Sequence, residues 1–510
     1  MPATANKIAV ATTSALAAEA AAEIAECGGN AVDCAIAAAM FSINTEPGVC
    51  ALAGSAYVTI WPTGRDPITI DGNVTIPGMG LPQDLNPAAE VIQMEYGGGI
   101  ETMVGATSVA VPGTLAALHL AAEQFGHLPW RELLRPTIRA ARDGFPLSAA
   151  CHYYLGYSGD IIFGRSDDGH QALHTGDGSL RGVRSDIVVP HLADTLNAIA
   201  EEGCKVFYEG DLGKRITDHV QQLGGLLTMQ DLKRYRAVIR PSLLVETGDW
   251  TIATNPPPAI GGVVLSAMLL AFANDPVVQW DSDSLQRLVR VQQAALSYRK
   301  KNLDAVPDVM KAAIRMLKLA GSGELISKWA SGSTVHTSVV DDAGLACAIT
   351  ASSGYGSGEM PAGTGLWLNN CLGELELNRD GLNAGPPGKR LPSNMAPGVA
   401  RCEDRVLAMG SPGADRITTA LHQFLINFIQ RGLSLNDAVA HPRMHLVLDD
   451  VGSNIAVEPG LDIPDIGLPI TRYPEIGMYF GGVVAALFSA EKGFDVAADP
   501  RREGGTFISA

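Results

Sequence analysis

Apolar and polar positions follow two different periods in the first hundred residues. Short apolar or alternating segments predict three strands, at 7–11, 56–61 and 66–71. Helical spacing predicts two helices, which begin at Ser14 and Ala31, and the pair Gly28-Gly29 ends the first of them. The stretch 75–105 is rich in Gly and Pro and predicts a long loop. Strands and helices are therefore expected to alternate in this part of the chain.

The hydrophobic period changes again further along the chain. Helical spacing dominates from 111 to 330, whereas 334–351 alternates with a period of two and predicts two strands joined by a tight turn at Asp342-Ala343-Gly344. A helix is predicted at 416–431, and further strands near 366–369, 398–409 (a pair), 453–458, 481–488 and 505–509. Strands at both ends and in the middle predict an α+β fold, in which stacked sheets are covered by helices as one domain.

Composition narrows the classes of protein that fit. With 510 residues, 46% apolar and 18% charged, the chain has the composition of a soluble globular protein with one large layered domain or several domains. Its net charge of −17 without a basic stripe argues against nucleic acid or an anionic membrane as a partner. Glu19 and Glu23 interrupt the alanine-rich run of the predicted N-terminal helix, which makes it amphipathic and unlike a signal peptide. The longest apolar run, 261–273, is too short to span a bilayer. Eight scattered cysteines without a CxxC pair favour reduced thiols and a cytoplasmic location.

The segment Ser331-Gly332-Ser333-Thr334 places a hydroxyl directly behind small residues and ahead of a predicted strand. A threonine at a chain break becomes a new N-terminus, and its α-amine, with an unperturbed pKa near ~8, can act as general base for its own hydroxyl. The alternative is that a β-branched residue here only reflects strand propensity. Thr334 is thus a candidate nucleophile.

Two loops could complete such a site. The segment Gly410-Ser-Pro-Gly413-Ala414-Asp-Arg416 follows a predicted strand and opens a helix, so the backbone N–H groups of Gly413 and Ala414 could stabilise negative charge. Ser393 and Asn394 are polar residues in a proline-bounded loop. In both loops, an ordinary turn is the alternative explanation.

Other catalytic motifs fail on their spacing. The glycines at 354–358 do not lead into a helix, and 385–390 lacks the Ser or Thr of a phosphate-binding loop. His441 and His445 lack the Glu of a zinc-protease helix. No Gly-x-Ser-x-Gly elbow occurs at the glycine–serine pairs, and the cysteines at 34, 347 and 371 have no obvious neighbouring base. We expect neither a metal nor a cofactor.

The order of short segments along nearly the whole chain resembles the γ-glutamyltransferase family of N-terminal-nucleophile hydrolases. The matching segments are 28–33, 105–113, 141–145, 207–210, 225–235, 256–262, 334–341, 356–358, 363–365, 368–370, 387–390, 410–413 and 440–443. The resemblance implies a four-layer αββα sandwich and an enzyme that acts on amides without a cofactor. It also implies a zymogen that cleaves itself between Ser333 and Thr334 into segments 1–333 and 334–510, which together form one intertwined domain.

The resemblance also implies roles for single residues. Thr334 would form an ester with the acyl group of a small amide, Ser352 would assist the new N-terminus, and Gly413 and Ala414 would form the oxyanion hole. The implied substrate-binding residues are Ser393 and Asn394 for a carboxylate, Glu374 for an amine, and Asn370 and Asn73. The implied partners are a small-molecule amide and the two fragments, with a dimer of such pairs left open.

This chain departs from the γ-glutamyl-specific members in its substrate contacts. Asn73 stands where the family has an arginine that clamps the substrate carboxylate, and an amide cannot replace a charged bidentate guanidinium. The segment 350–355 is two residues shorter and lacks an asparagine, Val335 replaces a second threonine, and Cys371 replaces a glutamine. We therefore expect an amidohydrolase or acyltransferase whose donor is not strictly γ-glutamyl. Two alternatives remain: a true γ-glutamyl hydrolase or transpeptidase on glutathione-like substrates that uses Arg65 or Lys389 as the cation, and a catalytically silent binding protein.

Overall fold

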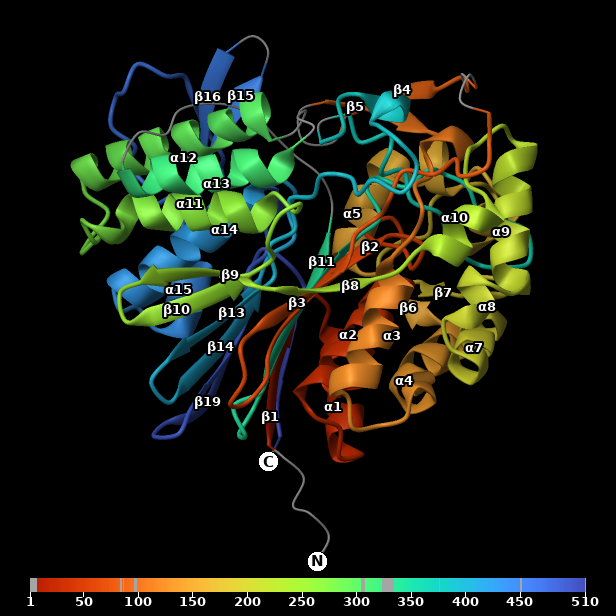
Figure 1. Cartoon of the computed structure of the whole chain (residues 1–510), viewed down its shortest axis with the longest axis horizontal. Coiled ribbons are helices and arrows are strands. Elements are labelled where there is room, and N and C mark those ends of the chain that lie inside the picture. The colour runs from red at the N-terminus through yellow and green to blue at the C-terminus, as the bar shows by residue number, and fades with distance from the viewer. Residues whose placement is uncertain are drawn as a thin grey trace, which may run out of the picture.

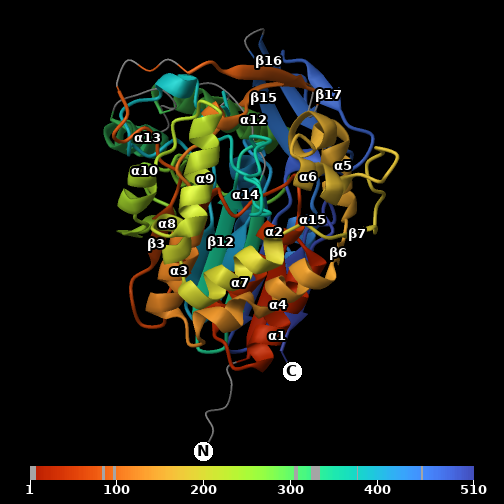
Figure 2. The same ribbon diagram turned by 90° about the vertical axis from the view of Figure 1, so that its right-hand side faces the viewer.

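The computed structural model describes residues 7–82, 85, 87–95, 99–303, 308–322, 334–375, 377–449 and 452–509. Two antiparallel sheets lie face to face in the middle of the molecule, and helices cover the outer face of each (Figure 1). The predicted αββα sandwich is confirmed by this arrangement. Figure 2 looks onto the helices on one side of the sandwich, among them α1, α4 and α7.

The first sheet has seven strands in the order β20-β1-β11-β12-β2-β3-β8. Neighbouring strands pair antiparallel throughout. Strand β1 lies between β20 and β11, so segments far apart in the sequence form adjacent ladders. The bounds are β1 Ile8–Thr12, β2 Ser55–Trp61, β3 Ile68–Gly72, β8 Val238–Pro241, β11 Val335–Asp341, β12 Ala346–Ser352 and β20 Gly505–Ile508.

The second sheet has six strands in the order β19-β18-β14-β13-β10-β9. Its bounds are β9 Leu243–Thr247, β10 Trp250–Thr254, β13 Gly398–Cys402, β14 Arg405–Gly410, β18 Val484–Ser489 and β19 Gly493–Ala498. Small side chains fill the space between the two sheets, which allows the sheets to pack closely. Members of this inner layer are Ala9, Ala11, Ala346, Ala348, Ala408 and Ala486.

Apolar helices cover both sheets. The first sheet packs against α1 (Ala15–Glu26), α2 (Ala31–Thr45), α3 (Thr114–Phe125) and α4 (Trp130–Asp143) in the largest core cluster. Every residue of α2 is buried, because its small side chains let it lie flat on the sheet. The second sheet packs against α11 (Gly261–Ala273), α14 (Arg416–Leu425) and α15 (Leu435–Ala440).

The remaining elements form the periphery. Outside α11 lie α12 (Ser282–Asn302), α13 (Val309–Ser322) and a small sheet of β15 (Met444–Asp449), β16 (Gly452–Val457) and β17 (Ile470–Arg472). On the other side lie α5 (Ala149–Ser158), α6 (Asp167–Leu173), α7 (Leu192–Glu202), α8 (Lys205–Tyr208), α9 (Asp211–Gln222), α10 (Met229–Arg234) and the pair β6 (Phe145–Pro146) and β7 (Asp186–Ile187). No helix of the described ranges is both long and apolar enough to cross a membrane.

Three local predictions were wrong. The expected loop at 75–105 contains a hairpin of β4 (Glu90–Met94) and β5 (Ile100–Val104), and the helical region 111–330 contains β8, β9 and β10. The expected strand at 366–369 makes only an isolated bridge between Leu368 and Ala53. The expected helix 416–431 is confirmed, with an α-helical part to Leu425 and a π-helical part at Ile426–Gln430. The pairing of such short strands depends on tertiary context, which local propensity does not encode.

Candidate active site

Thr334 lies directly before β11 of the first sheet, and only 3% of it is exposed. Side chains alternate along a strand, so Thr334 lies on the same face as His336 and Ser338, toward the second sheet. The His336 ring packs against Gly410 of β14 so closely that a Cβ there would lie 2.1 Å from it. Its Nδ1 and Nε2 lie 2.7 Å from Thr350 Oγ1 and 2.9 Å from Ser338 Oγ. Burial lowers the pKa of His336 to about 3, so this neutral ring holds the strand in place.

Two serines lie beside Thr334 at the same end of the sheet. The register of β11 and β12 pairs Val335 with Ala351, which places Ser352 opposite Thr334. Ser352 in turn pairs with Ser55 of β2, whose hydroxyl donates a 3.0 Å hydrogen bond to the Ser352 carbonyl. Hydroxyl-bearing residues at the ends of three neighbouring strands, β11, β12 and β2, therefore lie side by side.

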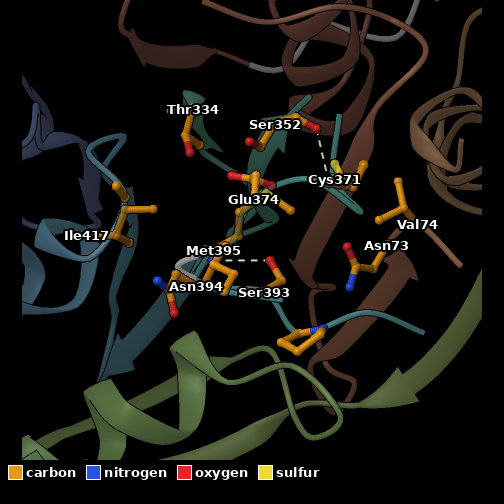
Figure 3. A pocket seen from close by; sticks show the side chains of 14 residues that line it. Asn73, Val74, Thr334, Ser352, Cys371, Glu374, Ser393, Asn394, Met395 and Ile417 are labelled. Carbon is orange, nitrogen blue, oxygen red and sulfur yellow. Dashed lines mark hydrogen bonds between the residues drawn. The ribbon is translucent and has the colours of Figure 1, made fainter. Parts of the chain in front are cut away.

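Thr334, Ser352 and Ser55 line one pocket (Figure 3). It gathers most of the residues predicted from the sequence, whereas Gly413 and Asn370 are not among the described residues that line it. The lining residues are Ser55, Asn73, Val74, Thr334, Ser352, Cys371, Glu374, Leu377, Pro392, Ser393, Asn394, Met395, Ala414 and Ile417. Ser333 lies outside the described residues, so the geometry of the predicted scissile bond stays a prediction.

The loop between β14 and α14 forms one wall of the pocket. Gly413 and Ala414 both have left-handed backbones, with φ of 117° and 66°. A Cβ at Gly413 would lie 2.7 Å from the Gly481 Cα atom, so only glycine fits there. No acceptor in the described part of the chain pairs with the backbone N–H of Gly413 or Ala414. The N–H of Ala414, a residue that lines the pocket, is therefore available to a developing oxyanion.

A buried ion pair, which the sequence did not reveal, supports this wall. Asn394 Nδ2 donates a 2.6 Å hydrogen bond to Asp415 Oδ1, and the same oxygen accepts from Arg299 Nη1 of α12 at 2.7 Å. Asp415 and Arg299 are each only 1% exposed. Asp415 directly follows the predicted Gly413–Ala414 pair and could have been suspected. Arg299 lies 116 residues away along the chain, and no local pattern points to it.

Asn370 has a structural place beside the pocket. Its Oδ1 accepts from the backbone N–H groups of Tyr355 at 2.7 Å and Gly356 at 3.2 Å. Its Nδ2 donates to Thr102 Oγ1 at 3.0 Å and Met103 O at 2.9 Å. Since both donors and the carbonyl are engaged, Asn370 shapes the 354–356 turn, and the structure does not bring its side chain to the substrate pocket.

Glu374 is the only charged residue among the described residues that line the pocket. Asn73 uses its side-chain Nδ2 to donate to the Leu391 carbonyl at 2.6 Å. Cys371 lies beside Glu374, and burial together with the charge of Glu374 raises the pKa of this thiol well above its usual value. Burial likewise raises the pKa values of Cys34 and Cys347, which disfavours a cysteine nucleophile.

The guanidinium of Arg390, which precedes the pocket segment 392–395 in the chain, makes its contacts with other protein groups. Arg390 Nη1 donates to Tyr235 Oη at 2.7 Å and to the Asn73 carbonyl. Its Nη2 donates to the Asp71 carbonyl at 3.1 Å and to the Arg236 carbonyl at 2.9 Å. Its Nε lies 3.2 Å from an Asp71 carboxylate oxygen. All five of its donors are thus engaged within the protein.

The two cations suggested from the sequence do not replace the missing clamp. Arg65 lies in the turn between β2 and β3, about 20 Å of strand away from Ser55. Lys389 donates from Nζ to the Ala384 carbonyl at 3.0 Å. Neither residue lines the pocket. Across the described ranges, no cluster of three or more His, Cys, Asp or Glu side chains could hold a metal ion.

Comparison with known proteins agrees with this geometry. The family model described as Gamma-glutamyltranspeptidase matches residues 17–509. The chain belongs to the gamma-glutamyltranspeptidase family. The predicted resemblance is thereby confirmed, and the chain is an N-terminal-nucleophile enzyme of the amide hydrolase and transferase class.

The relatives of this family member carry two kinds of name. It is 28% identical over 477 residues to the glutathione hydrolase proenzyme of Escherichia coli (strain K12), a match that covers 86% of this chain and 80% of that protein. It is 29% identical over 477 residues to the acylase ACY 1 proenzyme of Pseudomonas sp. (strain SE83), covering 87% and 83%. The crystal structure of cephalosporin acylase from Bacillus halodurans superposes with a TM-score of 0.80 at 24% identity, covering 99% of this chain and 96% of that one, which shows the shared fold.

Proposed function

We propose that this family member cleaves itself between Ser333 and Thr334 and then uses Thr334 as the nucleophile on a small amide that is not strictly a γ-glutamyl compound. The observation that carries the proposal is the position of Thr334, directly before β11 and among the residues that line a pocket together with Ala414. The relatives named proenzymes support a processed precursor.

Self-cleavage would begin when the Thr334 hydroxyl attacks the Ser333 carbonyl. The C–O bond forms, the peptide C–N bond breaks, and the chain is held as an ester with a free Thr334 amine. Water then hydrolyses the ester and leaves Ser333 as a carboxylate. The segments 1–333 and 334–510 would stay together, because β11 pairs with β1 on one side and β12 pairs with β2 on the other.

Turnover would use the same hydroxyl. The freed α-amine, with an unperturbed pKa near ~8, accepts the hydroxyl proton as Thr334 Oγ1 attacks the substrate carbonyl. The negative charge develops on the carbonyl oxygen, where the Ala414 N–H can stabilise it, and Ser352 lies opposite Thr334 to orient the amine. The substrate C–N bond breaks, and the leaving amine takes the proton. Water or an acceptor amine then releases the acyl group.

The cation-poor lining argues against a γ-glutamyl donor. A substrate α-carboxylate calls for a charged, bidentate partner, and no Arg or Lys is among the described lining residues. The relatives named glutathione hydrolases support the alternative, a glutathione-like donor held by Ser393 and Asn394 alone. We also keep a cytoplasmic location as part of the proposal, since all eight cysteines are free thiols.

The proposal is tested on the purified protein by denaturing electrophoresis and N-terminal sequencing. We expect two fragments, the smaller beginning at Thr334, and an electrophilic amide analogue that labels only this fragment. Thr334→Ala should remain one inactive chain. Thr337→Val is the matched control in the same strand and should still be cleaved. A Thr334→Ala protein that is cleaved or active would reject the proposal.

A further inference from the structure

A second pocket lies where β1 leads into α1, and it shares no lining residue with the pocket of Thr334. Thr13, one of the residues that line it, donates its backbone N–H to the His336 carbonyl at 3.1 Å. The His336 N–H in turn donates to Thr13 Oγ1 at 3.3 Å. The second pocket therefore borders the strand that follows Thr334, but the chemistry proposed for Thr334 uses none of its residues.

Two charged residues of the second pocket have buried atoms without a hydrogen-bond partner. Glu46 directly follows α2 and is 6% exposed, and its Oε1 has no hydrogen-bond partner among the described residues. The Nε atom of Arg502 is buried in the same condition. Burial raises the pKa of Glu46 to about 7, against the smaller opposing effects of Ser42, Arg502 and Ser14. At pH 8 the pocket thus presents a carboxylate and a guanidinium that can each still bind a ligand atom.

The N-terminal ends of two helices provide further donors. Glu503 engages the first N–H of each helix, because its carbonyl accepts from Ala15 of α1 at 3.1 Å and its Oε2 accepts from Ala149 of α5 at 2.9 Å. The next N–H groups, those of Leu16 and Ala150, have no acceptor in the described part of the chain. Both residues line the second pocket. Helix N-termini with free N–H groups favour a ligand carboxylate.

The balance of charges disfavours a ligand with a single charge. A ligand that carries only a carboxylate is repelled by Glu46, and one that carries only an ammonium leaves Arg502 and the helix donors unsatisfied. The charged residues that line the second pocket are two acids and two bases, Glu46, Glu503, Arg184 and Arg502. A ligand with both charges and no net charge therefore matches this pocket.

We infer that the second pocket binds a free α-amino acid with an apolar side chain. The ammonium of the amino acid binds Glu46, and its carboxylate, one carbon away, binds Arg502 and the helix donors. Leu16, Leu147 and Val183 line the same pocket and contact the apolar side chain. This inference goes beyond the acylation of Thr334 and does not depend on it, so a chain that remains uncleaved can be tested in the same way.

Three probes that share one carbon skeleton test the inference by calorimetric titration of the purified protein at pH 8. L-leucine has both charges, 3-methylbutylamine only the ammonium, and 4-methylpentanoate only the carboxylate. We expect the Kd of L-leucine to be at least about tenfold lower than that of either single-charge probe. Glycine, which lacks the apolar side chain, should bind about tenfold more weakly than L-leucine. No saturable binding of L-leucine, equal Kd values for the three probes, or a glycine Kd as low as that of L-leucine would overturn the inference.

A pair of variants assigns the binding to the second pocket. Glu46→Gln should raise the Kd of L-leucine about tenfold without weakening 4-methylpentanoate, and Arg502→Gln should raise it without weakening 3-methylbutylamine. Glu374→Gln is the matched control in the pocket of Thr334 and should leave the Kd of L-leucine unchanged. Because Glu46→Gln removes a buried charge, it should not destabilise the chain at pH 8, so a lost signal reports on binding. Binding of L-leucine that survives Glu46→Gln, or that is lost in Glu374→Gln, would overturn the assignment.

Discussion

Removing the charge of Asp415 should unbalance a buried ion pair behind the active-site wall. Asp415→Asn keeps the size of the side chain but removes the carboxylate charge that pairs with the buried Arg299 guanidinium. Breaking one partner of such a pair destabilises a protein by about 3–5 kcal/mol. With an unfolding entropy of about 2.1 cal/mol/K per residue over 510 residues, or roughly 1.1 kcal/mol/K, Tm should fall by about 3–5 °C.

The matched control for Asp415→Asn removes both charges. Arg299→Met alone should lower Tm as Asp415→Asn does, and the double variant should regain most of the loss, because neither charge of the Arg299–Asp415 pair remains. Differential scanning calorimetry measures Tm. The effect on Asn394 is measured as kcat/KM for an uncharged anilide, which should fall about tenfold in Asp415→Asn, because Asn394 Nδ2 loses its charged acceptor. Single variants within 1 °C of the parent (roughly 1 kcal/mol), or losses that simply add in the double variant, would refute the coupling.

Two further substitutions test the electrostatics and the backbone. Glu46 is buried with an Oε1 that has no hydrogen-bond partner among the described residues, and burial raises its pKa from 4.5 to about 7. Between these pH values the folded state keeps a proton on Glu46 that the unfolded state loses. The free energy of unfolding therefore falls as the pH rises from 4.5 to 7. In urea unfolding, Glu46→Gln should lack this pH-dependent loss of stability. The free energy of unfolding of the variant minus that of the parent should be about 3 kcal/mol larger at pH 8 than at pH 4. Parallel pH profiles of the two proteins would contradict this. Ala414→Gly should keep the N–H and relieve the left-handed backbone, so kcat should stay within about twofold while stability rises by ~0.5–1 kcal/mol, and a large loss of kcat would show that the Ala414 methyl group itself contributes to catalysis.

Elements with a clear local period were predicted well from the sequence. Helix α2 and the strand pair β11 and β12 have the predicted positions, because their apolar spacing and the turn at Asp342-Ala343-Gly344 are encoded within the segment itself. Strands β8, β9 and β10 were missed, since their own patterns are short and since β8 and β10 pair with β3 and β13, which lie far away in sequence. Strand β9 pairs with its neighbour β10.

The residues of the candidate site were also predicted in part from the sequence, and in part only the structure shows their place. Thr334, Ser352, Glu374, Ser393, Asn394, Ala414 and Asn73 were all named from the sequence and all line one pocket. Their catalytic and binding roles stay predictions. The place of Asn370 in a saturated hydrogen-bond network could not be foreseen, because its partners Thr102 and Met103 lie more than 260 residues away.

By itself, the sequence determined the family, the αββα fold and the nucleophile candidate, because ordered short motifs and local periodicity are properties of the chain. Only the tertiary structure decided which charges face the pocket. Arg390 and Lys389 are both close in sequence to Ser393, yet Arg390 is engaged by Asp71 and Tyr235 and Lys389 by a carbonyl. The charge of the site depends on which donors the fold has already satisfied, and that is a property of three-dimensional packing.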